Sequence, residues 1–129
     1  MSIFKVRLRA TDRLFSKYIR SRDGWACLAC GSRSKDYRED GQGLHCSHFW
    51  GRGHENTRFD PDNCISLCAY HHRLWAEEER DCYKDFMIKR LGQIGFDLLD
   101  VRAHLTKKRD DKLDAIIIRQ MLKEVDAIT

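Results

Sequence analysis

The chain has 129 residues, of which 42% are hydrophobic and 34% charged, so it is predicted to form one globular domain over residues 1–129 and is not expected to be disordered. No apolar run is long enough to cross a membrane, so no membrane partner is expected. The formal net charge is +4, and the excess lies in residues 1–60, where 12 Lys and Arg stand against 7 Asp and Glu; this favours a polyanionic partner such as nucleic acid.

The chain begins with a predicted extended segment followed by a helix. Phe4, Val6 and Leu8 alternate with basic residues, and this period of two fits either a strand or a flexible basic arm. Thr11 suits the N-cap of a helix over residues 12–22, which an Asp-Gly pair ends. The apolar stripe of this helix is predicted to contain Leu14, Phe15, Tyr18 and Ile19.

The middle of the chain is predicted to form a knuckle, a strand and a helix. Residues 25–43 hold a Cys-x2-Cys pair and a polar loop, and residues 44–49 form a short strand. After a charged, Gly-containing connection, Asp60 suits an N-cap and Pro61 suits the first position of a helix over residues 61–72. Candidate metal ligands therefore lie before the strand and at the end of the helix.

The last third of the chain is predicted to be helical. One helix covers residues 75–91, a turn covers residues 92–95, Asp97 caps the next segment, and Asp110 or Asp111 caps a final helix. The core positions of the first of these helices are predicted to be Trp75, Cys82, Phe86, Ile88 and Leu91. The final helix is predicted to bury a stripe of Leu113, Ile116, Ile117, Met121 and Val125.

The six cysteines indicate metal binding more than disulfide formation. The start of the chain lacks the continuous apolar stretch of a secretory signal, so a cytoplasmic location is expected. In a reducing compartment, cysteines favour metal over disulfides. Cys46, Cys64 and Cys82 are interpreted as small buried hydrophobes.

Four residues at paired spacings form a candidate structural zinc site. Cys27 and Cys30 can offer two thiolates from one tight turn, and Cys68 and His71, three apart on the predicted helix, share a face. A Cys3His set is a normal ligand set for structural zinc. The alternative is that Cys27 and Cys30 are ordinary buried cysteines, but the paired spacing favours zinc.

His48, Asn63 and His72 form a second candidate group. Adjacent helical residues point about 100° apart, so His72 is expected to face away from the zinc and towards the strand that carries His48. Asn63 can orient an imidazole by hydrogen bonding, and the ordinary pKa of histidine suits a general base near neutral pH. Each residue also has a structural interpretation: His72 as an exposed or capping residue, His48 as a structural histidine and Asn63 as a helix cap.

Together these residues resemble the HNH endonucleases of the ββα-metal (His-Me finger) group. The motifs that carry the resemblance are Cys27-x2-Cys30-Gly31, His48, Asn63 and Cys68-x2-His71-His72. Within this group the chain looks most similar to the phage lambda Rap/NinG recombination-nuclease branch, through Ser47-His48-Phe49, Arg58-Phe59-Asp60-x-x-Asn63 and Cys68. The resemblance implies an α+β fold, with a small zinc-stabilised ββα-metal core at residues 25–75, an N-terminal helix before it and a helical extension at residues 76–129.

The resemblance also implies a metal-dependent DNA endonuclease that hydrolyses phosphodiester bonds and acts on double-stranded or branched DNA, in recombination or DNA processing. In this reading His48 is the general base, His72 is a ligand to a catalytic Mg²⁺ or Mn²⁺, and Asn63 orients the base or helps to hold the metal. Structural Zn²⁺ is held by Cys27, Cys30, Cys68 and His71. For a phage-encoded enzyme, the location is the cytoplasm of the host cell.

Ser47 departs from the pattern of many HNH enzymes, which have Asp, Glu or His directly before the base as a second metal ligand. Hard divalent cations prefer oxygen ligands, and a neutral hydroxyl is a poor replacement for a carboxylate. The Rap/NinG branch also lacks an acid at this position. His45, Asp60 or Asp62 could supply the missing ligand from nearby.

Arg52 and Arg58 lie between the base and the predicted helix and are expected to contact DNA phosphates, because guanidinium groups bind phosphate bidentately. The alternative is that each arginine is only a solvated charge on the loop.

Two other functions stay open: a zinc-stabilised nucleic-acid-binding module without cleavage activity, and a zinc-based protein-interaction adaptor. The oligomeric state is open as well, and the helical tail could form a dimer.

Overall fold

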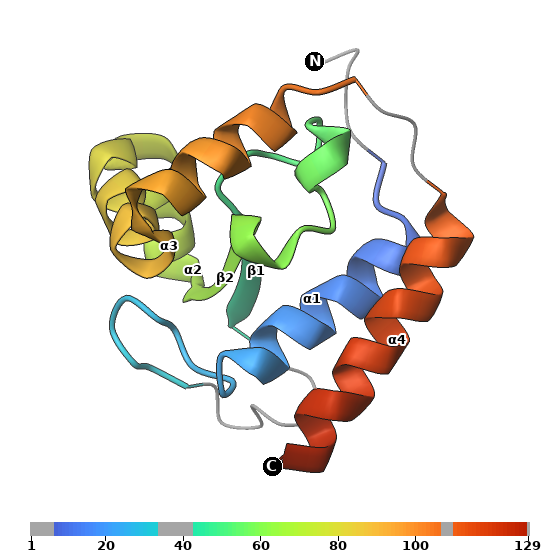
Figure 1. The fold of residues 1–129 in the computed structure, drawn as a ribbon. Helices are drawn as coiled ribbons and strands as arrows, with labels where there is room; N and C mark the ends of the chain where they lie inside the picture. Colours follow the sequence, from blue (N-terminus) through green and yellow to red (C-terminus); the bar gives the residue numbers. More distant parts are fainter. Residues whose placement is uncertain (1–6, 34–42, 107–109, 129) are drawn as a thin grey trace.

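The computed structural model describes residues 7–33, 43–106 and 110–128 (Figure 1). Phe4, Val6 and most of the predicted polar loop lie outside these ranges. In the described part, four α-helices and a two-stranded antiparallel sheet confirm the α+β class. The elements in chain order are α1 (Ala10–Arg22), β1 (Leu44–His48), β2 (Cys64–Cys68), α2 (Ala69–Arg73), α3 (Arg80–Ala103) and α4 (Asp111–Ile128).

The sheet lies between two groups of helices (Figure 1). The strands pair in a register that places His48 opposite Cys64. Because side chains alternate across a strand, one side of the sheet presents Cys46 and Cys64 to a cluster that includes α1 and α4. The other side presents Ile65 and Leu67 to a second cluster that includes α3.

The first helix, α1, begins two residues earlier than predicted. Arg9 occupies the N-cap position, and its backbone N–H donates to Asp12 Oδ2 at 2.7 Å. Thr11 therefore lies inside the helix and is buried, which corrects its predicted role as the cap. The predicted apolar stripe is correct, because Phe15, Tyr18 and Ile19 are buried.

The α-helix predicted over residues 61–72 is wrong for its first eight residues, 61–68. The side chain of Asp60 accepts from the Asp62 N–H at 3.0 Å, but it caps only a single 3-10 turn over Pro61–Asn63. The next residues form β2, because pairing with β1 lets Ile65 and Leu67 become fully buried. The helix α2 starts only after this strand, so strand, strand and helix follow in order.

A π-helical turn over Leu74–Glu78 joins α2 to α3. α3 is kinked at Gly92, whose φ of 78° and ψ of 161° are outside the helical region and are readily adopted by glycine. The turn predicted over residues 92–95 is therefore a kink at a single residue, Gly92, within α3. Cys82 was predicted to be buried but is exposed, whereas Tyr83 beside it is fully buried.

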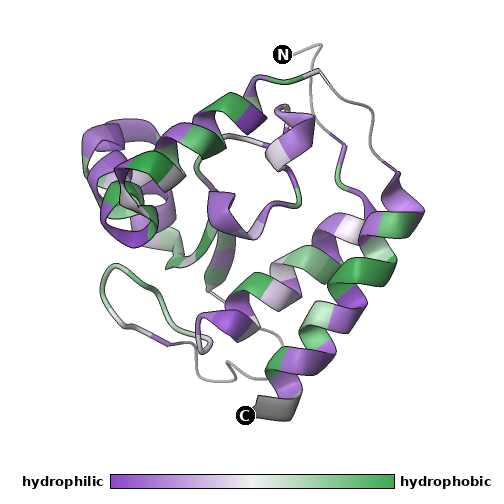
Figure 2. Cartoon of the chain, in the orientation of Figure 1, coloured by the Kyte–Doolittle hydropathy of each residue, from purple (hydrophilic) through white to green (hydrophobic). Residues whose placement is uncertain are grey.

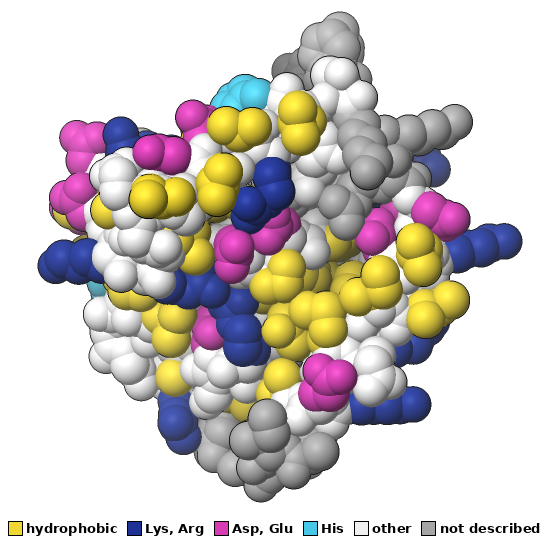
Figure 3. All heavy atoms as spheres, in the orientation of Figure 1, with side chains coloured by type: hydrophobic (Ala, Val, Ile, Leu, Met, Phe, Trp, Pro, Cys, Tyr) yellow, Lys and Arg dark blue, Asp and Glu magenta, His cyan; other side chains and the backbone are white. Residues whose placement is uncertain are grey.

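The last helix, α4, is capped by Asp110, as predicted, because Asp110 Oδ1 accepts from the N–H groups of Lys112 and Leu113. Hydrophobic residues recur along α4 and α1, which lie side by side (Figures 1 and 2). The predicted register of α4 is partly wrong, because Ile118 and Leu122 are buried. The exposed hydrophobic residues of α4 are Leu113, Ile116 and Ile117, and hydrophobic side chains are visible on this side of the molecule (Figure 3). None of the described helices combines the length and the apolar character needed to span a membrane.

Candidate metal and catalytic site

The four predicted zinc ligands lie together. The ligand atoms of Cys27, Cys30, Cys68 and His71 are all within 4.8 Å of one another. Cys68 Sγ is 4.0 Å from Cys30 Sγ and 3.4 Å from His71 Nδ1. Three thiols and one imidazole are donors that zinc prefers, so this group could hold a zinc ion as predicted.

Local backbone bonds shape the turn that carries the first two ligands. The N–H of Gly31 donates to the Cys27 carbonyl at 2.7 Å, and Gly31 has a φ of 76°, which favours glycine. The N–H of Leu28 donates to the Ser66 carbonyl at 3.0 Å, so the turn is attached to β2. Contact with Ser32 lowers the pKa of Cys30 to about 6, which favours the thiolate that a metal requires.

His72 points away from the zinc group and towards β1. Its ring stacks on the ring of His45, with centroids 5.0 Å apart and planes at 9°. Burial and the nearby His45 lower the pKa of His72, Arg52 adds to this effect, and Glu77 opposes it. His72 Nδ1 is buried without a hydrogen-bond partner among the described residues, which leaves a nitrogen able to bind an ion.

Ser47 and the two nearby aspartates, Asp60 and Asp62, all have partners other than a metal in this structure. Ser47 is fully buried, and its hydroxyl is hydrogen-bonded to the hydroxyl of Tyr83 at 2.8 Å. Asp60 and Asp62 both form ion pairs with Arg102, at 2.8 and 3.2 Å. These oxygen atoms are therefore already engaged elsewhere.

Glu77 is a carboxylate near His72 that the sequence analysis did not single out. It lies in the π-helical turn directly after α2, and its charge raises the pKa of His72. Turns of this type often occur at functional sites. The acidic run of residues 77–79 was visible in the sequence, but the proximity to His72 depends on the wider turn.

His48 is held in one tautomer by the loop that follows β1. Its Nε2 is 2.8 Å from the carbonyl oxygen of Arg58, and because a carbonyl can only accept, Nε2 must carry the proton. The neutral ring therefore has its lone pair on Nδ1. Burial, followed by the positive charge of Arg52, lowers the pKa of His48 to about 4, so the ring is neutral at pH 7.

Asn63 holds the same loop closed. It is fully buried, its Oδ1 accepts from the Trp50 N–H at 2.8 Å, and its Nδ2 donates to the carbonyls of Trp50 and Thr57 at 2.8 and 3.0 Å. The Asn63 amide thus bonds to loop backbone and not to the His48 ring. It shapes the segment whose Arg58 carbonyl fixes the tautomer of His48.

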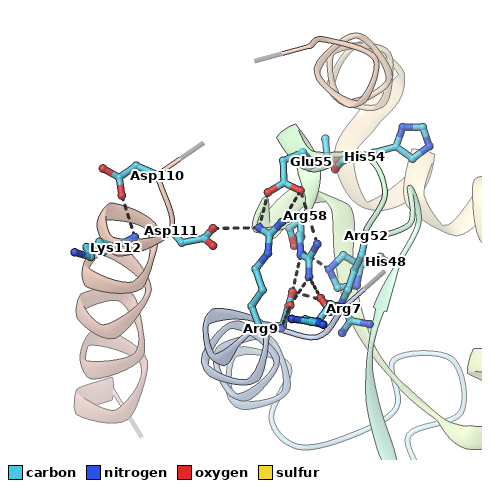
Figure 4. A network of polar contacts seen from close by, with 12 residues as sticks. Arg7, Arg9, His48, Arg52, His54, Glu55, Arg58, Asp110, Asp111 and Lys112 are labelled. Atoms are coloured by element: carbon cyan, nitrogen blue, oxygen red, sulfur yellow. Dashed lines mark hydrogen bonds and ion pairs between the residues drawn. The ribbon is translucent and has the colours of Figure 1, made fainter. Parts of the chain in front are cut away.

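Arg58 is buried, which corrects its predicted contact with phosphate. Only 2% of the residue is exposed, and Arg58 lies inside a network of polar contacts with Arg9 and Glu55 close by (Figure 4). Its guanidinium donates to both carboxylate oxygens of Asp12, at 2.9 and 2.5 Å. Burial opposes ionisation of Asp12, but hydrogen bonds from Arg58 and from the Arg9 backbone hold its pKa below the ordinary value. Arg52 remains one-third exposed and is available at the surface.

Replacing Arg58 by Met is expected to lower the free energy of unfolding by about 3–5 kcal/mol, because it leaves the buried Asp12 carboxylate without its main partner. Urea unfolding measures the change. Arg52→Met is the matched control, since its 3.4 Å pair with the same carboxylate is partly exposed and should contribute less than about 1 kcal/mol. Equal losses in the two variants would contradict this assignment.

His48 and His72 do not stack on each other; among the described residues, His48 contacts Phe15 of α1, whereas His72 contacts His45. The positive charge of Arg52 acts on both histidines, because it lowers the pKa of His48 and the pKa of His72. Arg52 Nε is buried without a hydrogen bond among the described residues, but it lies 3.4 Å from Asp12 Oδ1.

Comparison with curated proteins and with solved structures found no match for this chain. Comparison with family models found one described as "Bacteriophage Lambda NinG protein", which matches residues 5–127. That range includes the four candidate zinc ligands, both candidate catalytic histidines and the helical extension. The chain belongs to the NinG family of phage lambda-type proteins.

Proposed function

We propose that this protein is a metal-dependent DNA endonuclease of the HNH type that hydrolyses phosphodiester bonds during phage recombination or DNA processing. Support comes from the order of strand, strand and helix, which sets His48 on β1 and His72 on α2. The zinc group anchors one end of this unit by joining the knuckle to the start of α2.

The observation that carries the proposal is the buried Nδ1 of His72, which has no hydrogen-bond partner among the described residues. Buried polar atoms in folded proteins are normally hydrogen-bonded, so the unpaired His72 Nδ1 indicates a missing partner. A divalent ion would supply the partner of His72 Nδ1, and the one-third-exposed guanidinium of Arg52 would bind a DNA phosphate.

The proposed roles follow from the donor atoms. His72 would hold Mg²⁺ or Mn²⁺, and Glu77 would be the carboxylate ligand, because its charge acts on the His72 pKa. His45 is less suitable in its present position, because the lone pairs of two stacked rings lie in parallel planes that do not meet at one ion. The ion, when bound, stabilises negative charge on the phosphate and on the leaving oxygen.

His48 would act as the general base through Nδ1. Since Nε2–H is bonded to the Arg58 carbonyl, Nδ1 is the nitrogen able to take a proton from the attacking water. The low pKa of His48 keeps Nδ1 unprotonated at neutral pH. Arg52 would hold the scissile phosphate, and Asn63 would keep the loop in place.

The test is incubation of the full chain with supercoiled and with branched DNA in Mg²⁺, Mn²⁺ or EDTA. We expect nicking with at least one of the ions and none in EDTA, and a loss of nicking in Glu77→Gln, with Glu78→Gln as the neighbouring control. Absence of nicking with both ions at every protein concentration would reject the nuclease.

A zinc-stabilised module that binds nucleic acid without cutting it is the second candidate. The position of Ser47 favours it, because the residue before the proposed base is buried and bonded to Tyr83, where many HNH enzymes have a metal ligand. DNA binding without nicking, under the same conditions, would support this module.

A further inference from the structure

We propose that Cys46, His48 and Cys64 form a second metal site, separate from the zinc knuckle, that takes a thiophilic ion such as Zn²⁺ or Cd²⁺. The ligand atoms of the three residues lie within 4.8 Å of one another. From the sequence the two cysteines were predicted only to be buried hydrophobes, so their position beside His48 is a finding of the tertiary structure.

The sheet brings these side chains together. Cys46 and His48 are two residues apart on β1 and therefore point to the same side, and Cys64 is directly opposite His48 on β2. Two paired strands fix all three backbone positions. In a tetrahedral zinc site, ligand atoms lie about 3.5 Å apart, so side-chain adjustments alone could close this group around an ion.

The donor set selects the kind of ion. Two sulfur atoms and one imidazole suit Zn²⁺, Cd²⁺ or Cu⁺, whereas Mg²⁺ and Mn²⁺ prefer oxygen. His48 already has the arrangement of a metal-bound histidine, because one ring nitrogen donates to a backbone carbonyl and the other keeps its lone pair.

The charge balance is compatible with a buried site. Binding of a divalent ion releases one proton from each thiol, and two thiolates, a neutral imidazole and the ion together have no net charge. Burial of a neutral complex avoids the large cost of burying an isolated charge. Cys64 is fully buried and Cys46 nearly so, whereas His48 is partly exposed and gives the ion an entry side.

Occupation of this site would inhibit DNA cleavage, because the ion takes the same lone pair that the proposed base needs. This consequence rests on the proposed function. The binding of the ion does not, so the site can be tested on a chain that shows no cleavage at all.

The test uses Cd²⁺ as the probe, with the full chain kept reduced by a phosphine. We expect two equivalents of Cd²⁺ to bind, seen as thiolate-to-metal absorbance in the ultraviolet, and two cadmium NMR signals from different sulfur environments. Cys64→Ala and Cys46→Ala should each lose the second equivalent and keep the first. Cys82→Ala is the matched control and should keep both, since Cys82 is exposed and outside both groups.

His48→Gln provides a variant that keeps both cysteines, in case the cysteine variants fail to fold. It should also lose the second equivalent, and circular dichroism checks that each variant is folded. A single equivalent and a single cadmium signal in the unmodified chain would overturn the site. A second equivalent that persists in folded Cys64→Ala, Cys46→Ala and His48→Gln would overturn it as well.

If cleavage is observed, micromolar Zn²⁺ added beyond the knuckle equivalent should suppress it. Cys64→Ala, when folded and active, should resist this suppression, whereas Cys82→Ala should remain as sensitive as the unmodified chain. Equal suppression in both variants would show that Zn²⁺ inhibits at another position.

Discussion

Replacing Cys30 by Ser is expected to abolish zinc binding and cooperative folding. Cys30 supplies one of four ligand atoms in a group that joins the knuckle, the end of β2 and the start of α2. Structural zinc contributes about 10–16 kcal/mol of apparent binding free energy in zinc-finger peptides, which equals or exceeds the whole stability of a typical domain. A serine hydroxyl is a poor substitute for a thiolate at this ion.

Zinc content and thermal unfolding measure the outcome. Cys82→Ser is the control, because Cys82 is an exposed cysteine outside both ligand groups and its replacement should change neither quantity. A chelator added to the unmodified chain should reproduce the Cys30→Ser behaviour. A Cys30→Ser protein with unchanged zinc content and unchanged melting would show that the knuckle is not a zinc site.

Replacing His48 by Gln is expected to reduce DNA nicking by about 100- to 10,000-fold, the usual contribution of a general base. Gln can still donate a hydrogen bond to the Arg58 carbonyl, so the loop should keep its shape, but its amide cannot accept a proton from water. DNA binding and thermal unfolding should change little. Nicking rates under single-turnover conditions measure the loss.

The pH dependence of nicking gives a second readout. Because the pKa of His48 is lowered to about 4, its base form is present throughout neutral pH and is lost only as pH falls through about 4. The His48 step should therefore not produce the acid limb near pH 6.5 that an ordinary histidine would give. His104→Gln serves as the control, since His104 is exposed and occupies the C-cap position after α3. Full nicking by folded His48→Gln would remove His48 from the proposed role.

Local patterns in the sequence predicted the four candidate zinc ligands, the end of α1 at Arg22 and the start of α4. The spacing of Cys27 with Cys30 encodes a ligand pair within one turn. Cys68 and His71 also lie together, but Cys68 ends β2 and occupies the N-cap of α2, so the two do not share a helix as predicted. The cap at Asp110 and the apolar stripe of α1 were also predicted, because capping and helical period depend on neighbours three or four residues away.

The burial of charged and polar residues depends on contacts between segments that are far apart in the chain. Arg58 is internal because Asp12, 46 residues earlier in the chain, supplies its counter-charge, and no local pattern carries that information. In the same way, β2 replaced a predicted helix because β1 offered a pairing partner and a buried face for Ile65. Local sequence fixes periods, caps and ligand spacings, whereas burial and strand pairing depend on free energy gained from distant partners.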